Sequence, residues 1–185
     1  MTATAPAKRP MTADEFLAWA ESQPRRQELH AGEVFAMSPE RLEHNEVKTA
    51  VWGGLNDGIR RAGLPCSALG DGMSVRVDET TVYEPDAQLR CGPRLPKGTI
   101  EIPDPLVVVE VASPSSSRID KAIKLEGYFR IPSVRHYLIV AVEHRKIIHH
   151  RRGDDGTITT TVLAGGTLTL DPPGLSLDVA ACFPE

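Results

Sequence analysis

The sequence predicts an α/β fold in which one central mixed β-sheet carries a helix on each face. Three observations predict it. Residues 42–61 place apolar side chains four positions apart, the spacing of an amphipathic helix. Residues 105–113 read PLVVVEVAS, a nearly unbroken apolar run typical of a strand covered on both faces. Around these elements the expected order is helix, strand, strand, strand, helix, strand, which favours helices packed on both faces of one sheet.

Length and composition indicate a single soluble-type domain. Its 185 residues are expected to form one domain over residues 12–185, after a disordered lead-in over residues 1–11. The net charge of −4 opposes non-specific adhesion to DNA but permits a local basic patch. No apolar run approaches the roughly 18–20 residues that span a bilayer, so no membrane association is expected.

The cysteines bear on the expected compartment. Cys66, Cys91 and Cys182 are far apart in the sequence and match no metal-ligand spacing. They are expected to be reduced and packed, as in a cytoplasmic protein. The N-terminus also lacks the apolar core of a signal peptide, and a cytoplasmic location is therefore the expectation.

The N-terminal part of the chain predicts a helix and a hairpin. The helix covers Thr12–Glu21, with Thr12 as the N-cap and Glu15 completing a capping box. In the following RQELHAGEVFAM, a turn at Ala31–Gly32 separates two short extended pieces. These elements are additions to the core that begins with the helix over residues 42–61.

The core and the C-terminal part follow in order. The helix over residues 42–61 ends near Gly63, and three extended segments come next: GMSVRVDET, VYEPDAQLRC and PLVVVEVAS. A second helix is expected over Arg118–Arg130, where Pro132 blocks its continuation. The strand VRHYLIVAVEH follows, then a peripheral antiparallel hairpin made of RKIIHHRR and TITTTVL, and finally the closing segment LDPPGLSLDVAACF.

Glu110 is the unusual residue of the apolar run. Burying an ionised carboxylate without partners costs several kcal/mol, so this residue needs an explanation. Strand alternation places Glu110 on one face with Val108 and Ala112. Two readings remain open: a glutamate that lies at a sheet edge or pairs with a nearby arginine, or one half of a metal site.

A second carboxylate would favour the metal site, and two Pro-Asp pairs offer one. Asp104 lies six residues before Glu110 on the same extended segment. At about 3.3 Å per residue the two lie roughly 20 Å apart, too far to share an ion. Asp86, in Pro85-Asp86, lies on the preceding strand, and a neighbouring strand can bring it beside Glu110. Asp86 is therefore the predicted partner.

A lysine completes the constellation. An Asp on one strand and Glu-x-Lys on the next are the signature of the PD-(D/E)XK nucleases, but Ala112 occupies the lysine position here. On the following helix, Asp120, Lys124 and Tyr128 recur every four residues and share one face. The chemistry requires an ammonium near the ion, whichever element supplies it. Lys124 is predicted to fill the space that Ala112 leaves.

These motifs resemble one known family. RQELHAGEVFAM, YEPDAQLRC and residues 103–140 together resemble the Uma-two family of restriction-endonuclease-like proteins, over roughly residues 12–180. The resemblance implies a restriction-endonuclease-like core of order αβββαβ with a central mixed sheet, plus the N-terminal helix and hairpin and a C-terminal hairpin. The chain departs from the family pattern at Leu138 and at Ala141-Val142, where Trp and Asp-Pro are usual.

The resemblance also implies a site. It implies Asp86 and Glu110 as metal ligands and, with Lys124 as the migrated lysine, as the catalytic residues. Five further residues are expected at the rim or in accessory roles: Glu28, Glu33, His44, Asp120 and Tyr128.

The implied activity is Mg²⁺-dependent endonucleolytic hydrolysis of DNA, with Mn²⁺ as a substitute ion. A homodimer is expected because cleaving a duplex needs two cuts. Two alternatives remain open: a nuclease acting on RNA, and a non-catalytic nucleic-acid-binding or assembly module that keeps the fold.

The basic segment His144–Arg152 has two readings. Alternate residues of a strand face opposite sides, so its charges cannot all form one surface. It is either a charged edge hairpin that resists aggregation or part of a nucleic-acid patch.

Overall fold

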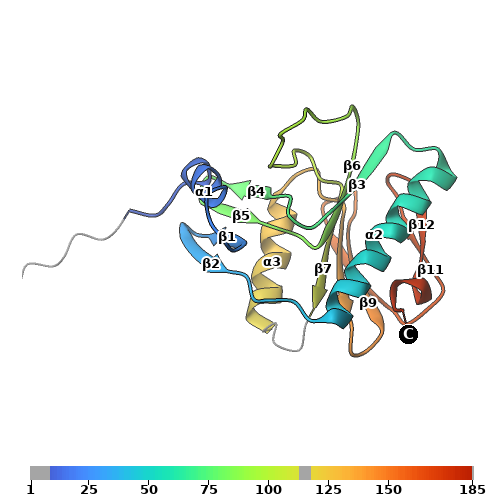
Figure 1. Ribbon diagram of the computed structural model, residues 1–185. Helices are drawn as coiled ribbons and strands as arrows, with labels where there is room; N and C mark the ends of the chain where they lie inside the picture. The colour runs from blue at the N-terminus through green and yellow to red at the C-terminus, as the bar shows by residue number, and fades with distance from the viewer. Residues whose placement is uncertain (1–8, 113–117, 185) are drawn as a thin grey trace, which may run out of the picture.

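The computed structural model describes residues 9–112 and 118–184, with the backbone alone for residues 118–121. Most of the expected lead-in, residues 1–8, lies outside this part. The central element is a six-stranded sheet of order β10-β9-β8-β7-β6-β3 (Figure 1). Its strands are β3 (Cys66–Gly70), β6 (Ala87–Cys91), β7 (Val107–Ala112), β8 (His136–Ala141), β9 (Lys146–Arg152) and β10 (Ile158–Leu163). β7 and β8 are parallel and the other neighbours are antiparallel, so the expected mixed sheet is confirmed.

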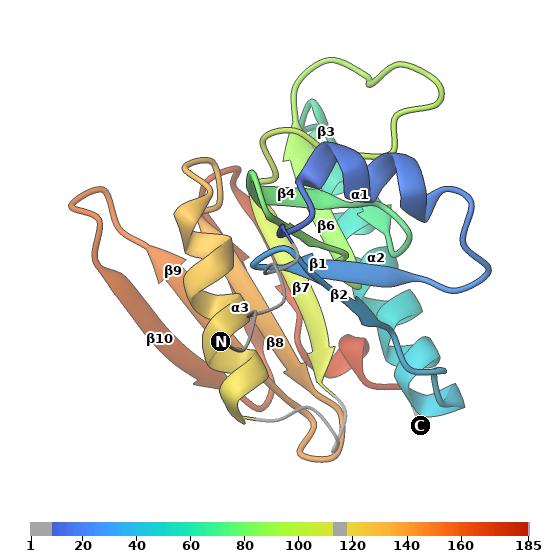
Figure 2. The same ribbon diagram turned by 90° about the vertical axis from the view of Figure 1, so that its left-hand side faces the viewer.

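Two helices cover the two faces of this sheet, α2 (Leu42–Ala62) on one side and α3 (Arg118–Arg130) on the other (Figures 1 and 2). The apolar run of β7 explains why both are needed. Val107, Val109 and Val111 pack in the core on the α2 side, and Val108 packs with Tyr128 of α3. No helix in the described part of the chain is long and apolar enough to cross a membrane.

The N-terminal additions form a second layer. A four-stranded sheet of order β2-β1-β5-β4 contains β1 (Gln27–His30), β2 (Glu33–Ala36), β4 (Val75–Asp78) and β5 (Thr81–Tyr83). Helix α1 (Ala13–Ala20) packs on it, with Phe16 against Leu29 and Val82. Thr12 caps α1, and the predicted capping box with Glu15 is present. The predicted helix and hairpin are therefore confirmed.

The assignment of the three core strands needs a correction. The segment GMSVRVDET forms β4, which pairs with β5 in the smaller sheet and not with the central one. VYEPDAQLRC is not one strand, because it divides into β5 and β6 around Glu84–Asp86, where Pro85 offers no N–H donor. The first of the three core strands in chain order is instead β3, which follows the left-handed cap of α2 at Gly63. The order αβββαβ is realised by α2, β3, β6, β7, α3 and β8.

A second hairpin, C-terminal to β9 and β10, packs against α2. It consists of β11 (Thr167–Leu170) and β12 (Leu175–Asp178), followed by the short 3₁₀ helix η1 (Ala180–Cys182). Four hairpin leucines lie in the same buried cluster as the apolar face of α2: Leu168, Leu170, Leu175 and Leu177. The hairpin therefore covers the side of α2 that the central sheet leaves open.

The basic segment contains β9, the inner strand of the hairpin at one edge of the central sheet. β9 lies between β8 and β10, so β10 forms the edge of the sheet. Ile147, His149 and His150 of β9 are buried. Lys146 and Arg151 are exposed, so the segment forms a charged edge hairpin as expected, and the nucleic-acid patch stays a prediction.

The expectation that all three cysteines are reduced is wrong for two of them. Cys66 and Cys91 are directly opposite in the β3–β6 ladder and form a disulfide. Their spacing in the sequence gave no indication of this pairing, because the antiparallel register alone brings them together. Cys182 is a free, buried thiol. The cysteines therefore no longer support the expected cytoplasmic location.

Candidate functional site

Asp86 lies where two strands of the central sheet separate. The pairing of β6 with β7 reaches Ala87 and Val109, and the Asp86 amide donates to the Val109 carbonyl at 3.0 Å. Beyond that point Asp86 Oδ2 accepts a hydrogen bond from the Val111 amide at 2.6 Å. The side chain thus replaces the missing strand partner of Val111, and this bond fixes a buried carboxylate beside the end of β7.

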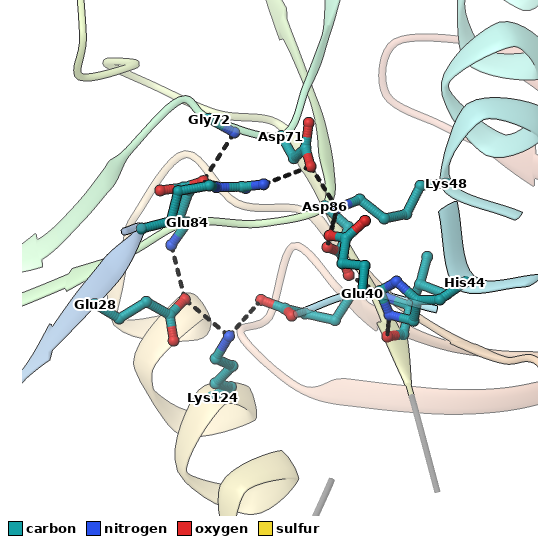
Figure 3. A network of polar contacts seen from close by, with 12 residues as sticks. Glu28, Glu40, His44, Lys48, Asp71, Gly72, Glu84, Asp86 and Lys124 are labelled. Atoms are coloured by element: carbon teal, nitrogen blue, oxygen red, sulfur yellow. Dashed lines mark hydrogen bonds and ion pairs between the residues drawn. The ribbon is translucent and has the colours of Figure 1, made fainter. Parts of the chain in front are cut away.

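Glu110 faces α3 and meets two of the residues predicted on that helix. Its Oε1 accepts hydrogen bonds from Lys124 Nζ at 2.9 Å and from the Tyr128 hydroxyl at 2.6 Å. Lys124 also donates to Glu28 Oε1 at 2.9 Å, so it bridges β1 and β7 (Figure 3). The four-residue spacing of Lys124 and Tyr128 therefore brings both side chains to one carboxylate oxygen.

The close approach of α3 depends on a glycine. A Cβ at Gly127 would lie 2.6 Å from a ring carbon of Tyr83 in β5. Lys124 Nζ lies 5.5 Å from the centre of the same ring. Gly127 thus allows the helix to pack closely enough for Lys124 to reach the carboxylates.

Burial controls the protonation of this pair. It raises the pKa of Glu110 to about 7, against the opposing effect of Lys124 and with the Asp86 carboxylate acting in the same direction. Burial alone would lower the pKa of Lys124, but the Glu110 and Glu28 carboxylates outweigh it and raise this pKa above its ordinary value. Lys124 is therefore a cation throughout the physiological pH range.

A second lysine, which the sequence analysis did not single out, enters from α2. Lys48 is 5% exposed, and its Nζ lies 2.5 Å from Asp71 Oδ2 and 3.1 Å from Asp86 Oδ1. It also bonds to Glu40. Burial would lower the pKa of Lys48, and its three carboxylate partners raise it. The sequence contained a signal for this position. Lys48 is three residues before Val51, and this spacing places the lysine on the apolar face of α2.

His44 and Glu40 lie at the start of the same helix. His44 Nε2 is 2.5 Å from the Val111 carbonyl oxygen, and the other ring nitrogen, Nδ1, is buried with no hydrogen-bond partner among the described residues. A ring nitrogen of His44 and one oxygen each of Glu40 and Asp86 lie within 4.8 Å of one another. These three residues form a group with the spacing of metal ligands.

The residues present fit a divalent cation. One continuous network contains six carboxylates and three cationic side chains (Figure 3): Glu28, Glu40, Asp71, Glu84, Asp86 and Glu110 with Arg26, Lys48 and Lys124. Glu84 and Asp86 are buried and need positive partners, but in this network the carboxylates outnumber the cations six to three. Carboxylate oxygens are also the ligands that hard divalent ions prefer.

The other predicted residues divide into three groups. Glu28, His44 and Tyr128 belong to the network described above. Glu33 is exposed on β2 and makes no hydrogen bond or ion pair with a described side chain. Asp120 lies in α3, and its side chain is outside the described part of the structure.

Comparison with known proteins identifies the family of this chain. The family model Uma2, described as "Putative restriction endonuclease", matches residues 13–180. An uncharacterized protein from Synechocystis sp., slr1290, is 28% identical over 183 residues, which cover 94% of this chain and 91% of that protein.

A solved structure shares the fold. The crystal structure of "a putative nuclease belonging to DUF820" from Anabaena variabilis superposes with a TM-score of 0.73 at 16% identity, over 94% of this chain and 98% of that one. From the family match over nearly its whole length, this chain belongs to the Uma2 family of restriction-endonuclease-like proteins.

Proposed function

We propose that this protein is a divalent-metal-dependent endonuclease that hydrolyses DNA phosphodiester bonds, with Mg²⁺ as the ion and Mn²⁺ as a substitute. The observation that carries the proposal is the position of Lys124, whose Nζ lies 2.9 Å from Glu110 at the strand end that also binds Asp86. A helix thereby supplies the ammonium that Ala112 cannot. The family's description as a restriction endonuclease supports the same chemistry.

Each side chain has a role that follows from its contacts. Asp86 and Glu110 would hold the ion, which when bound lowers the pKa of water and offsets charge on the phosphate. Lys124 retains its proton, so it is suited to orient the attacking water and not to remove a proton from it. Glu28 and Tyr128 fix the positions of Lys124 and Glu110 through the hydrogen bonds described above. The water would lose a proton to solvent as its oxygen bonds to phosphorus, and the leaving sugar oxygen would gain a proton from solvent as its bond to phosphorus breaks.

A plasmid-cleavage assay tests the proposal. Supercoiled DNA would be incubated with wild type, Asp86→Asn and Lys124→Ala in Mg²⁺, in Mn²⁺ and in EDTA. We expect cleavage by wild type in either ion and none in EDTA. Each substitution should lower the cleavage rate about 100-fold or more, the scale seen when a group that stabilises the transition state is removed.

The chain offers matched controls for both substitutions. Asp104, in the other Pro-Asp pair, and Lys97 are exposed. Asp104→Asn and Lys97→Ala should cleave as wild type does. Equal rates for all five proteins, or cleavage that persists in EDTA, would contradict the proposal.

Substrate and assembly are tested separately. Duplex DNA and RNA of the same sequence should be compared, and faster hydrolysis of the RNA would make RNA the proposed substrate in place of DNA.

We also propose a homodimer, since breaking both strands requires two sites. Light scattering during size-exclusion chromatography should give twice the chain mass of 20.1 kDa.

A further inference from the structure

We propose that His44 is itself a ligand of the ion, through Nδ1 and together with Glu40 and Asp86, and that this nitrogen makes the site prefer Mn²⁺ to Mg²⁺. The inference deepens the proposed function and rests on its placement of the ion at Asp86. It goes beyond that function by adding a ligand from α2 and by predicting that the substitute ion, Mn²⁺, binds more tightly than Mg²⁺.

The hydrogen bond of His44 decides which ring nitrogen is available. The Val111 carbonyl can only accept, so the short contact at 2.5 Å means that Nε2 carries the proton. In the neutral ring Nδ1 then has a free lone pair, and it is the buried atom without a partner among the described residues. Histidines that bind metals usually donate their other N–H to a backbone carbonyl or carboxylate in this way. The Val111 carbonyl therefore holds His44 in the tautomer that a metal ligand requires.

The spacing of the three ligands suits one ion. Two ligand atoms that are each about 2.0–2.3 Å from a shared ion lie at most roughly 4.6 Å apart. One ring nitrogen of His44 and one carboxylate oxygen each of Glu40 and Asp86 lie within 4.8 Å of one another. Small side-chain rotations therefore suffice to close them around a single cation.

Lys48 is the group that opposes binding, because its ammonium bonds to both Glu40 and Asp86. Asp71 resolves this conflict. It bonds to Lys48 at 2.5 Å and is not one of the proposed ligands, so Lys48 keeps a carboxylate partner when an ion takes the other two. Lys48 and the ion therefore compete for Glu40 and Asp86, and removing Lys48 should strengthen ion binding.

The nitrogen ligand determines the selectivity. Mg²⁺ prefers oxygen ligands and dehydrates reluctantly. Mn²⁺ suits the same carboxylate ligands as Mg²⁺, and as a first-row transition ion, although the weakest binder of that series, it accepts an imidazole nitrogen more readily than Mg²⁺ does. His44 should therefore contribute to the affinity for Mn²⁺ much more than to the affinity for Mg²⁺.

Isothermal titration of the full chain, freed of metal with EDTA and dialysed, tests the inference with MnCl₂ and MgCl₂ as probes. Wild type should bind Mn²⁺ about 10-fold or more tightly than Mg²⁺. His44→Ala should weaken Mn²⁺ binding about 10–100-fold and Mg²⁺ binding much less. Lys48→Met should bind both ions more tightly. His144→Ala changes an exposed histidine outside the site and should match wild type.

Pulsed EPR of the bound Mn²⁺ gives a direct readout of the ligand. Wild type should show hyperfine coupling to a nitrogen nucleus, and His44→Gln should not. This second variant supplies an amide donor for the Val111 carbonyl without a nitrogen lone pair, so it tests the ligand even where His44→Ala fails to fold.

The outcomes separate the two proposals. Equal affinity for the two ions, or unchanged Mn²⁺ binding and nitrogen coupling in His44→Gln, would overturn the role of His44 and leave the proposed nuclease intact. A histidine-dependent preference for Mn²⁺ without any DNA or RNA cleavage would support the role of His44 as a ligand and contradict the proposed nuclease activity.

Discussion

Two lysines reach the same carboxylate network from opposite faces of the sheet, and they differ in their surroundings. Lys48 of α2 is 5% exposed and bonds to three carboxylates. Lys124 of α3 has a side chain that is 20% exposed and bonds to two. The comparison indicates that the two lysines have different roles. The enclosed lysine compensates buried charge, and under the proposed function the more open lysine would meet a substrate.

Removing the enclosed lysine should have the largest effect on stability. Lys48→Met leaves Asp86, Asp71 and Glu40 without their shared cation and should cost about 3 kcal/mol, the scale for breaking a buried ion pair. Urea unfolding in EDTA measures the loss. Addition of Mn²⁺ should restore part of it, because the ion supplies positive charge to the same oxygens. An unchanged urea midpoint would show that Lys48 does not stabilise the network.

A neutral buried cluster provides the contrast to both lysines. His136 accepts at Nδ1 from His149 Nε2 and donates from Nε2 to the Pro172 carbonyl, each at 2.8 Å. Burial lowers the pKa of both histidines to about 4. The unfolded chain therefore binds more protons than the folded protein between about pH 6.5 and 4.

The free energy of unfolding should accordingly fall as the pH decreases through this range, by up to about 1.4 kcal/mol per pH unit for each of the two histidines. Denaturant unfolding at several pH values measures it. His149→Gln, which removes one of the two titrating rings, should show a shallower pH dependence than wild type. The same slope in both proteins would locate the acid sensitivity elsewhere.

Removing the more open lysine should cost less than removing Lys48. Lys124→Met breaks two ion pairs that are partly exposed, and the expected loss is about 2 kcal/mol, between the scales for buried and surface pairs. Glu110 can also take up a proton, since its pKa is already raised to about 7. Lys97→Met is the matched exposed control. A loss of unfolding free energy larger than that of Lys48→Met would contradict the expected difference between the two lysines.

The smallest expected effect concerns the hydroxyl that fixes Glu110. Tyr128→Phe removes one hydrogen bond and should cost about 1 kcal/mol, with Lys124 still bonded to the same carboxylate. Tyr137→Phe changes another buried tyrosine, whose hydroxyl makes no hydrogen bond with a described residue. Equal thermal stability of the two variants would show that the bond to Glu110 contributes nothing.

Local signals in the sequence predicted most of the elements and one side of the site. The capping box of Thr12 and Glu15 marks the start of α1 because both partners lie within one turn. The four-residue spacing of Lys124 and Tyr128 predicted that they share a helix face, and both meet Glu110. Such predictions succeed when the residues that interact are set by the period of a single element.

Tertiary structure alone decided which residues meet on the α2 side of the site. Lys48 joins the network only because Asp71 and Asp86, far along the chain, fold against α2. The Cys66–Cys91 bond and the assignment of β4 and β5 to a separate sheet likewise depend on which strands become neighbours. No spacing in the sequence encodes these contacts, since each joins elements whose relative position is determined by packing of the whole core. The sequence by itself determined which residues share a face; the packing of the faces decided which charges meet.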